Sequence, residues 1–212
     1  PYNKDTKISV FGRCQLDYFY VGYGSGGDVN APYFVNVIDG IKNAGGKVNE
    51  WLLNYYKDFS KNNPAPHGFW GHWPMSFEEP HLDDETVKRA SEESDVALVV
   101  IGRAAGEDRE NTLTKGSYYL TDEERKLLDQ VCNNFSNVTV LLDCGNVIDM
   151  QWVLDYNDRL RGIIYAWQGG MESGNAIADV LYGKVNPSEK LPDTTQIKNK
   201  NNQMLRLLAI NF

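Results

Sequence analysis

Residues 95–102 (DVALVVIG) decide the fold class, because they form a continuous apolar run rich in strand-forming residues. Such a run, without alternation of polar and apolar positions, is typical of a strand buried on both faces of a parallel sheet. Residues 138–142 and 160–167 have the same character, and residues 7–12 form a shorter run of this kind. The four segments predict the strands of one mostly parallel sheet.

Helical segments alternate with these strands. Apolar spacing predicts helices over 33–44, 121–135 and 171–182, and acidic residues open a polar helix over 83–93. Thr121 and Glu124 have the spacing of a capping box. Three further assignments complete the chain: a weak strand over 48–51, a short helix over 148–156 and an irregular insertion, rich in Pro, Gly and aromatic residues, over about 55–80. The alternation predicts an α/β sandwich, a single domain whose sheet is flanked by helices on both faces.

Length and composition exclude several classes of protein. The 212 residues suit one domain, or two small ones, and a complete (β/α)₈ barrel needs about 250. A net charge of -8 argues against nucleic acid as a partner, and no run approaches the roughly 18 apolar residues of a membrane span. Three cysteines, Cys14, Cys132 and Cys144, do not form a disulfide framework, so the compartment stays open between cytoplasmic and secreted.

An acidic segment follows the strand over 95–102. Residues 104–111 (AAGEDREN) stand where open α/β sheets place their ligands, at the carboxyl end of a strand. The small residues before Glu107 allow a sharp turn that projects its carboxyl group. The alternative is a solvated charge cluster, in which Arg109 pairs with Asp108 or Glu110.

A glycine cluster at residues 22–27 (GYGSGG) lies between the first strand and the first helix. Its position, with Glu50 at the end of the next predicted strand, imitates a dinucleotide-binding loop. About ten residues separate the strand from the glycines, however, and the spacing is not the fingerprint. We expect a backbone loop packed against a neighbouring surface in preference to a nucleotide site.

Aromatic and histidine residues are concentrated in the insertion over 55–80. The histidines lack the spacing of a zinc site, so no metal or cofactor is expected. The aromatic rings either stack on sugar faces or fix the long loop to its own domain. The histidines are His67, His72 and His81, and the aromatic residues are Phe69, Trp70, Trp73 and Phe77, of which Trp70 and Trp73 are the candidates for substrate binding.

Five segments, taken in order, resemble the second domain of glycoside hydrolase family 3, the α/β sandwich that follows the catalytic barrel in most members. They are residues 7–30, 95–111, 115–132, 138–153 and 162–194. The last is the most specific: Trp-x-x-Gly-x-Glu at 167–172 precedes Ala-Ile-Ala-Asp-Val-Leu-x-Gly-x-x-Asn-Pro-Ser-x-Lys-Leu-Pro at 176–192. Glu189 departs from the family pattern, which usually has Gly there. The resemblance indicates a domain over 1–194, with a linker or non-native tail over 195–212.

The resemblance implies a retaining β-glucosidase-type enzyme acting on β-D-glucosides or related β-glycosides. In the family, the nucleophile is an Asp of the barrel domain, which this chain lacks, and the acid/base is commonly a Glu in a Gly-Glu-Gly setting. Glu107 matches that Glu best, with Asp108 in place of the following Gly, and Glu110 is the reserve candidate. Asp108 and Arg109 are then expected to hold the loop or contact substrate, and the chain alone is expected to be inactive.

The alternative function is a non-catalytic carbohydrate-binding or interaction module of the same fold. The aromatic segment 69–77 would then be its binding surface.

Overall fold

The computed structural model describes residues 1–27, 29–107, 111–156, 158–187 and 207–209. Six parallel strands form one sheet in the order β2-β1-β3-β4-β5-β6. The strands are β1 (Lys7–Phe11), β2 (Lys47–Val48), β3 (Val96–Arg103), β4 (Val138–Cys144), β5 (Leu160–Tyr165) and β6 (Leu207–Ala209). The predicted α/β sandwich with a parallel sheet is confirmed, and β3 and β4 are buried along their whole length.

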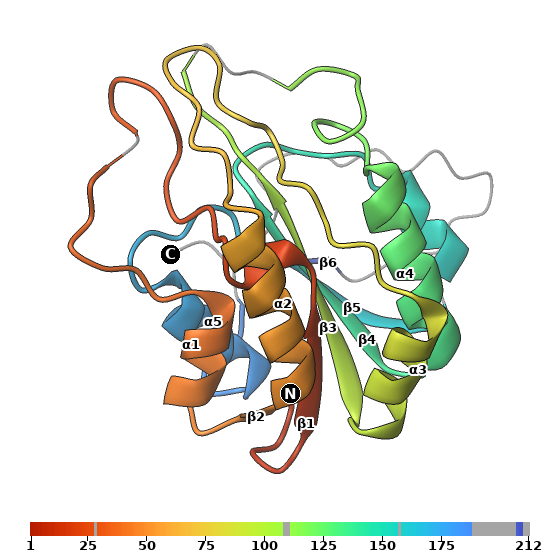
Figure 1. Cartoon of the computed structure of the whole chain (residues 1–212). Helices are drawn as coiled ribbons and strands as arrows, with labels where there is room; N and C mark the ends of the chain where they lie inside the picture. The colour runs from red at the N-terminus through yellow and green to blue at the C-terminus, as the bar shows by residue number, and fades with distance from the viewer. Residues whose placement is uncertain (28, 108–110, 157, 188–206, 210–212) are drawn as a thin grey trace.

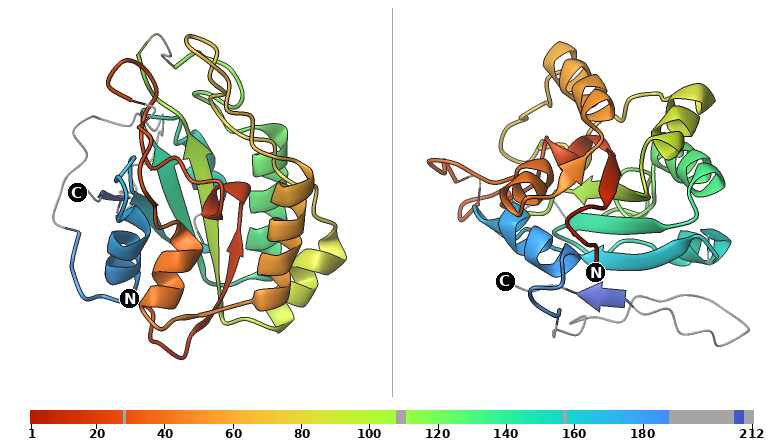
Figure 2. Two further views of the ribbon diagram at one scale, coloured as in Figure 1. Left: turned by 60° about the vertical axis from the view of Figure 1, so that its left-hand side comes forward. Right: turned by 90° about the horizontal axis from the view of Figure 1, so that it is seen from below.

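Helices cover both faces of the sheet (Figure 1). They are α1 (Val37–Asn43), α2 (Glu50–Asn62), α3 (Asp84–Glu92), α4 (Asp122–Asn134) and α5 (Ser173–Leu181), with short 3-10 helices η1 (Arg13–Gln15) and η2 (Gln151–Tyr156). The α1 and α5 helices lie together on one face, and α3 and α4 cover the other, as the view from below in Figure 2 shows. Two layers of apolar side chains, one on each face, therefore make the core.

The α1–α5 contact depends on two glycines. An added Cβ at Gly40 would lie 1.9 Å from the carbonyl oxygen of Gly174, and one at Gly174 would lie 2.0 Å from the carbonyl oxygen of Asn36. Real Cβ atoms do not approach oxygens so closely, so the absence of side chains lets the two helix backbones touch.

The α2 helix corrects the prediction for residues 48–62. The strand expected over 48–51 is only the two-residue β2, and Asn49 then caps α2 by accepting a hydrogen bond from the N–H of Leu52. Leu52, Leu53 and Tyr56 are the buried residues of this helix. Polar and aromatic residues between them concealed the helical spacing, so the irregular connection begins after α2 and not near residue 55.

Other boundaries agree more closely. The capping box of Thr121 and Glu124 is present at the start of α4, and η2 occupies the short helix expected over 148–156. The three cysteines are buried and unpaired. Of the expected tail, residues 207–209 pair with β5 as β6, and 195–206 and 210–212 lie outside the described residues, so the tail stays a prediction there.

The strand order fixes the place where a ligand site is expected. From β1 the chain moves outward to β2, and it then returns to the other side of β1 to form β3. In such sheets the connections that leave adjacent strands in opposite directions open a crevice at their carboxyl ends. The connections after β1 and β3 should therefore carry the functional residues.

Candidate functional site

Three connections meet at the carboxyl ends of β1 and β3. The backbone of Tyr23, in the glycine loop (residues 22–27), donates its N–H to the carbonyl of Ala105 at 2.8 Å. Its carbonyl accepts the N–H of Glu107 at 3.2 Å, and the two segments form a parallel β-bridge between Tyr23 and Gly106. Met75, in the connection after α2, accepts the N–H of Ala104 at 2.8 Å. Backbone hydrogen bonds with Tyr23 on one side and Met75 on the other thus fix residues 104–107.

Glu107 is exposed at the end of this arrangement, and its carboxyl group is held by the glycine loop. Its Oε2 accepts two hydrogen bonds from Ser25, one from the backbone N–H at 2.8 Å and one from the side-chain Oγ at 2.5 Å. The hydrogen bonds from the Ser25 hydroxyl and N–H lower the pKa of Glu107, because both stabilise its ionised form.

Glycines make this close approach possible. Gly24 has a φ of +112°, and a Cβ there would lie 2.5 Å from the Cβ of Glu107. A Cβ on Gly106 would lie 2.3 Å from the carbonyl oxygen of Tyr23. The glycine cluster thus serves as a backbone loop packed against the segment that carries Glu107, which is the interpretation favoured from the sequence.

The aromatic segment lies beside the same loops. Trp73 is buried, with 3% of its surface exposed, and its ring stacks on Tyr23 at a centroid distance of 5.2 Å. Trp70 packs edge-on against Trp73 and keeps 49% of its surface exposed, while Phe69 is 69% exposed. The burial of Trp73 favours a packing role for it, so Trp70 is the tryptophan of this pair with an open surface for a sugar ring.

A buried ion pair that the sequence did not reveal anchors the start of the acidic segment. Arg103, the last residue of β3, contacts both carboxylate oxygens of Glu124 at 2.6 Å. Its guanidinium also donates to the carbonyls of Ser117 and Tyr119. The capping-box spacing identified Glu124, but only as a cap; the apolar run around Arg103 gave no signal for its partner.

Asp108, Arg109 and Glu110 lie outside the described residues. Of the histidines, His81 lies 3.1 Å from Lys126 and His72 packs against Phe69. Within the described ranges, no group of three or more His, Cys, Asp or Glu side chains could hold a metal ion, and no described helix is long and apolar enough to cross a membrane.

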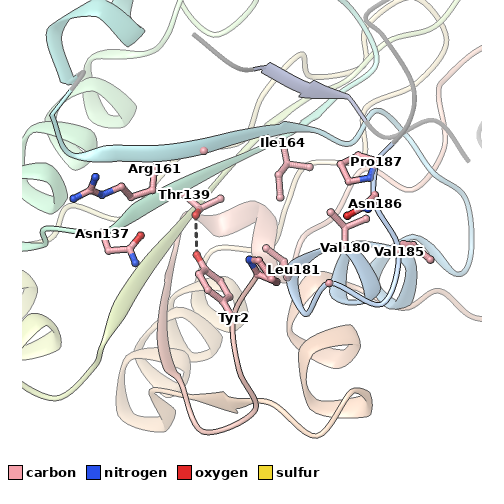
Figure 3. Close-up of a pocket in the computed structure, with 13 residues that line it drawn as sticks. Tyr2, Asn137, Thr139, Arg161, Ile164, Val180, Leu181, Val185, Asn186 and Pro187 are labelled. Atoms are coloured by element: carbon pink, nitrogen blue, oxygen red, sulfur yellow. Dashed lines mark hydrogen bonds between the residues drawn. The ribbon is translucent and has the colours of Figure 1, made fainter.

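A separate cavity of about 500 Å³ lies at the amino ends of β4 and β5 (Figure 3), and Glu107 is not among its described lining residues. Tyr2 donates to the Oγ1 of Thr139 at 2.8 Å beside it, and Arg161 and Ile164 contribute to its wall. Its described lining contains no carboxyl group, and it lies at the strand ends opposite those where such sheets bind ligands. It is therefore not the candidate site.

The structure is thus an α/β domain with a parallel sheet, and it has an exposed carboxylate, Glu107, where the connections after β1 and β3 meet. A match to the family described as glycosyl hydrolase family 3 C-terminal domain spans residues 1–208, past the boundary at Thr194 expected from the sequence. The chain belongs to glycosyl hydrolase family 3, as its C-terminal α/β domain.

Relatives of known name agree with this assignment. The chain is 46% identical to a beta-glucosidase of Ruminococcus albus over 195 residues, 92% of this chain and 20% of the relative. It is 33% identical to beta-glucosidase A of Butyrivibrio fibrisolvens, over 92% of this chain and 26% of the relative. The chain thus spans about a fifth to a quarter of the length of these relatives.

Solved structures give the same result. A beta-glucosidase from Paenibacillus barengoltzii superimposes with a TM-score of 0.88 at 46% identity, over 92% of this chain and 21% of that one. Beta-glucosidase 3B from Thermotoga neapolitana, in complex with glycerol, has a TM-score of 0.79 at 33% identity, over 91% of this chain and 27% of that one.

Proposed function

We propose that this domain supplies the acid/base carboxyl group, Glu107, of a retaining β-glucosidase whose nucleophile lies on a (β/α)₈ barrel domain outside this chain. One observation carries the proposal: Glu107 is an exposed carboxylate fixed at the topological switch point of the sheet. Its substrate would be a terminal β-D-glucoside or a related β-glycoside, the class named by its beta-glucosidase relatives.

The proposed reaction has two steps, with Glu107 acting in opposite senses. In the first, a barrel carboxylate attacks the anomeric carbon while Glu107 gives its proton to the glycosidic oxygen, and the bond to the leaving group breaks. In the second, water attacks the anomeric carbon, its proton passes to Glu107, and the bond to the barrel carboxylate breaks. Retaining enzymes need the two carboxyl groups about 5–5.5 Å apart, so the domains must close over the sugar.

The acid step places a demand on the environment of Glu107. A general acid must hold its proton near neutral pH, whereas the hydrogen bonds from Ser25 lower the pKa of the exposed carboxyl group. Closure against the barrel would remove water from Glu107 and bring it near the nucleophile carboxylate. Burial and a like charge both raise a carboxyl pKa, so the closed arrangement would supply the proton affinity that the open domain lacks.

Trp70 is the proposed contact for the sugar or its leaving group. Its exposed ring lies on Trp73, which in turn stacks on the Tyr23 that pairs with the Glu107 segment. Aromatic faces offer apolar area to the C–H faces of a pyranose. Asp108 and Arg109, next in the chain, stay proposals as loop or substrate contacts, and Glu110 stays the reserve acid/base.

The test is Glu107→Gln in the enzyme formed by this domain and its barrel. The rate of cleavage of glucosides with poor leaving groups should fall about 10²–10⁴-fold. For glucosides with activated leaving groups, the rate of the first step should fall much less. Azide should then restore turnover of the activated substrate by replacing water without base assistance. Glu85→Gln, an exposed carboxyl group on α3, is the matched control, and Glu110→Gln tests the reserve candidate.

Near-normal activity of Glu107→Gln with poor leaving groups would contradict the proposal. The 212-residue chain alone should not hydrolyse p-nitrophenyl β-glucoside. Hydrolysis by that chain would also contradict the proposal. Calorimetric titration with cello-oligosaccharides addresses the alternative of a non-catalytic binding module: binding by the isolated chain that is lost in Trp70→Ala would favour that alternative.

A further inference from the structure

The glycine loop is built to meet one side chain of a segment far away in sequence. Tyr23 pairs through its backbone on both sides of Gly106, and Gly24 lies directly against the Cβ of Glu107. A Cβ added at Gly27 would lie 2.2 Å from the carbonyl oxygen of Gly22, so the loop itself closes tightly. These constraints bring Ser25, 82 residues away in sequence, to the carboxyl group of Glu107.

Ser25 binds the carboxyl group of Glu107 unevenly. Its N–H and its hydroxyl both donate to Oε2, and among the described residues no donor reaches Oε1. A protonated carboxyl group carries its hydrogen on one oxygen and accepts hydrogen bonds best on the other. With two donors already on Oε2, Oε1 is the oxygen left to carry the proton.

We propose that Ser25 is a positioning residue for Glu107: it orients the carboxyl group so that Oε1 exchanges the proton with substrate and water, an inference that rests on the proposed function. The contact is made by backbone and side chain together, so the orientation is retained in both steps of the reaction. In the first step Oε1 loses its proton to the glycosidic oxygen, and in the second it receives the proton of the attacking water. Ser25 itself exchanges no proton with the substrate.

Loss of the Ser25 hydroxyl should change the pH dependence of the enzyme in a way that loss of folding would not. Removing the hydroxyl of Ser25 withdraws a hydrogen bond from the ionised form of Glu107, so its pKa should rise. In the enzyme with its barrel, Ser25→Ala should therefore move the basic limb of the kcat/KM profile to higher pH, by up to about one unit. Looser orientation should also lower kcat/KM for a glucoside with a poor leaving group, by about 10-fold to 100-fold.

Two variants separate positioning from a general structural effect. Ser25→Thr keeps the hydroxyl and should restore most of the activity and the original basic limb. Ser136→Ala removes an exposed hydroxyl before β4, at the other end of the sheet, and should change neither quantity. Profiles are measured with one activated and one unactivated aryl β-glucoside, because only the unactivated substrate needs strong acid assistance.

The outcomes distinguish this inference from the proposed function. If Glu107→Gln abolishes cleavage of the unactivated substrate and Ser25→Ala shifts the basic limb, both are supported. If Glu107→Gln abolishes cleavage but the pH profile of Ser25→Ala coincides with that of the wild type, the role of Ser25 is wrong and the role of Glu107 stands. If Glu107→Gln is nearly as active as the wild type, the proposed function fails and the inference fails with it.

Discussion

Arg103, at the carboxyl end of β3, and Glu124, in the first turn of α4, form a buried two-pronged ion pair in which Nη1–Oε1 and Nη2–Oε2 are each 2.6 Å. The side chains are 0% and 4% exposed. The pair joins the end of β3, which leads to Glu107, to the start of α4, the next helix in the chain. The segment that carries Glu107 thus begins directly after a buried ion pair.

Glu124→Ala should destabilise the domain by about 3–5 kcal/mol, because it leaves the guanidinium of Arg103 buried without its counter-charge. It also removes the reciprocal half of the capping box, in which Glu124 accepts the N–H of Thr121. Urea denaturation of the 212-residue chain measures the change in the free energy of unfolding. Asp122→Ala, which breaks the exposed contact with Lys115, is the control and should have little effect. A small loss for Glu124→Ala would show that Arg103 finds other partners.

Gly40→Ala should separate α1 from α5. The new Cβ would lie 1.9 Å from the carbonyl oxygen of Gly174, which is backbone and cannot rotate away. We expect a loss of at least about 1–3 kcal/mol, the usual range for an overpacked contact, and a lower Tm by calorimetry. Gly26→Ala is the control, because a Cβ added there would have no heavy atom of the described residues within 4 Å, its chain neighbours aside. Equal Tm values for the two variants would contradict the tight helix contact.

Glu79 should make the domain less stable as the pH rises. Burial raises its pKa to about 8, so the folded state keeps this proton at pH values where the unfolded chain has lost it. Stability therefore falls between the ordinary carboxyl pKa, near 4.5, and about 8, and levels off above. Glu79→Gln cannot ionise, and its Oε1 can still accept the N–H of Arg13 that Glu79 binds. The free energy of unfolding of this variant, measured by urea denaturation from pH 5 to pH 9, should fall less than that of the wild type. If the two proteins lose stability in parallel with pH, the raised pKa of Glu79 is wrong.

Trp70 and Trp73 should respond differently to truncation. Trp70→Ala removes an exposed ring and should raise KM for the glucoside with little change in Tm. Trp73→Ala removes a buried ring stacked on Tyr23 and should cost about 3–5 kcal/mol of stability. Steady-state kinetics and calorimetry on both variants make the comparison. A raised KM for Trp73→Ala at unchanged Tm would reverse the two roles.

The sequence was most informative where one segment determines its own structure. The apolar run that becomes β3 and the Thr121–Glu124 capping box were both recognisable without tertiary information. The α2 helix was missed because burial of Leu52, Leu53 and Tyr56 stabilises it among polar and aromatic neighbours. Asn49, the N-cap residue, was the signal in the sequence that could have located the start of α2.

The site was predictable in its parts but not in its assembly. Glu107 was identified at the carboxyl end of a strand, and the glycine cluster was identified between the first strand and the first helix. Their contact through Ser25 depends on β1 and β3 being neighbours, and strand order is a property of the whole sheet. The burial of Trp73 likewise follows from its stacking on Tyr23, which no local pattern records.

The two-residue strand β2 has a consequence for how this domain meets other proteins. A long exposed edge strand can pair with a strand of another chain, and proteins prevent this with short edge strands that carry lysine. Here the edge strand is only Lys47–Val48. Lys47 is exposed, and its Nζ lies 2.7 Å from Oδ1 of Asp5. Strand-by-strand aggregation along this side of the sheet is thereby disfavoured.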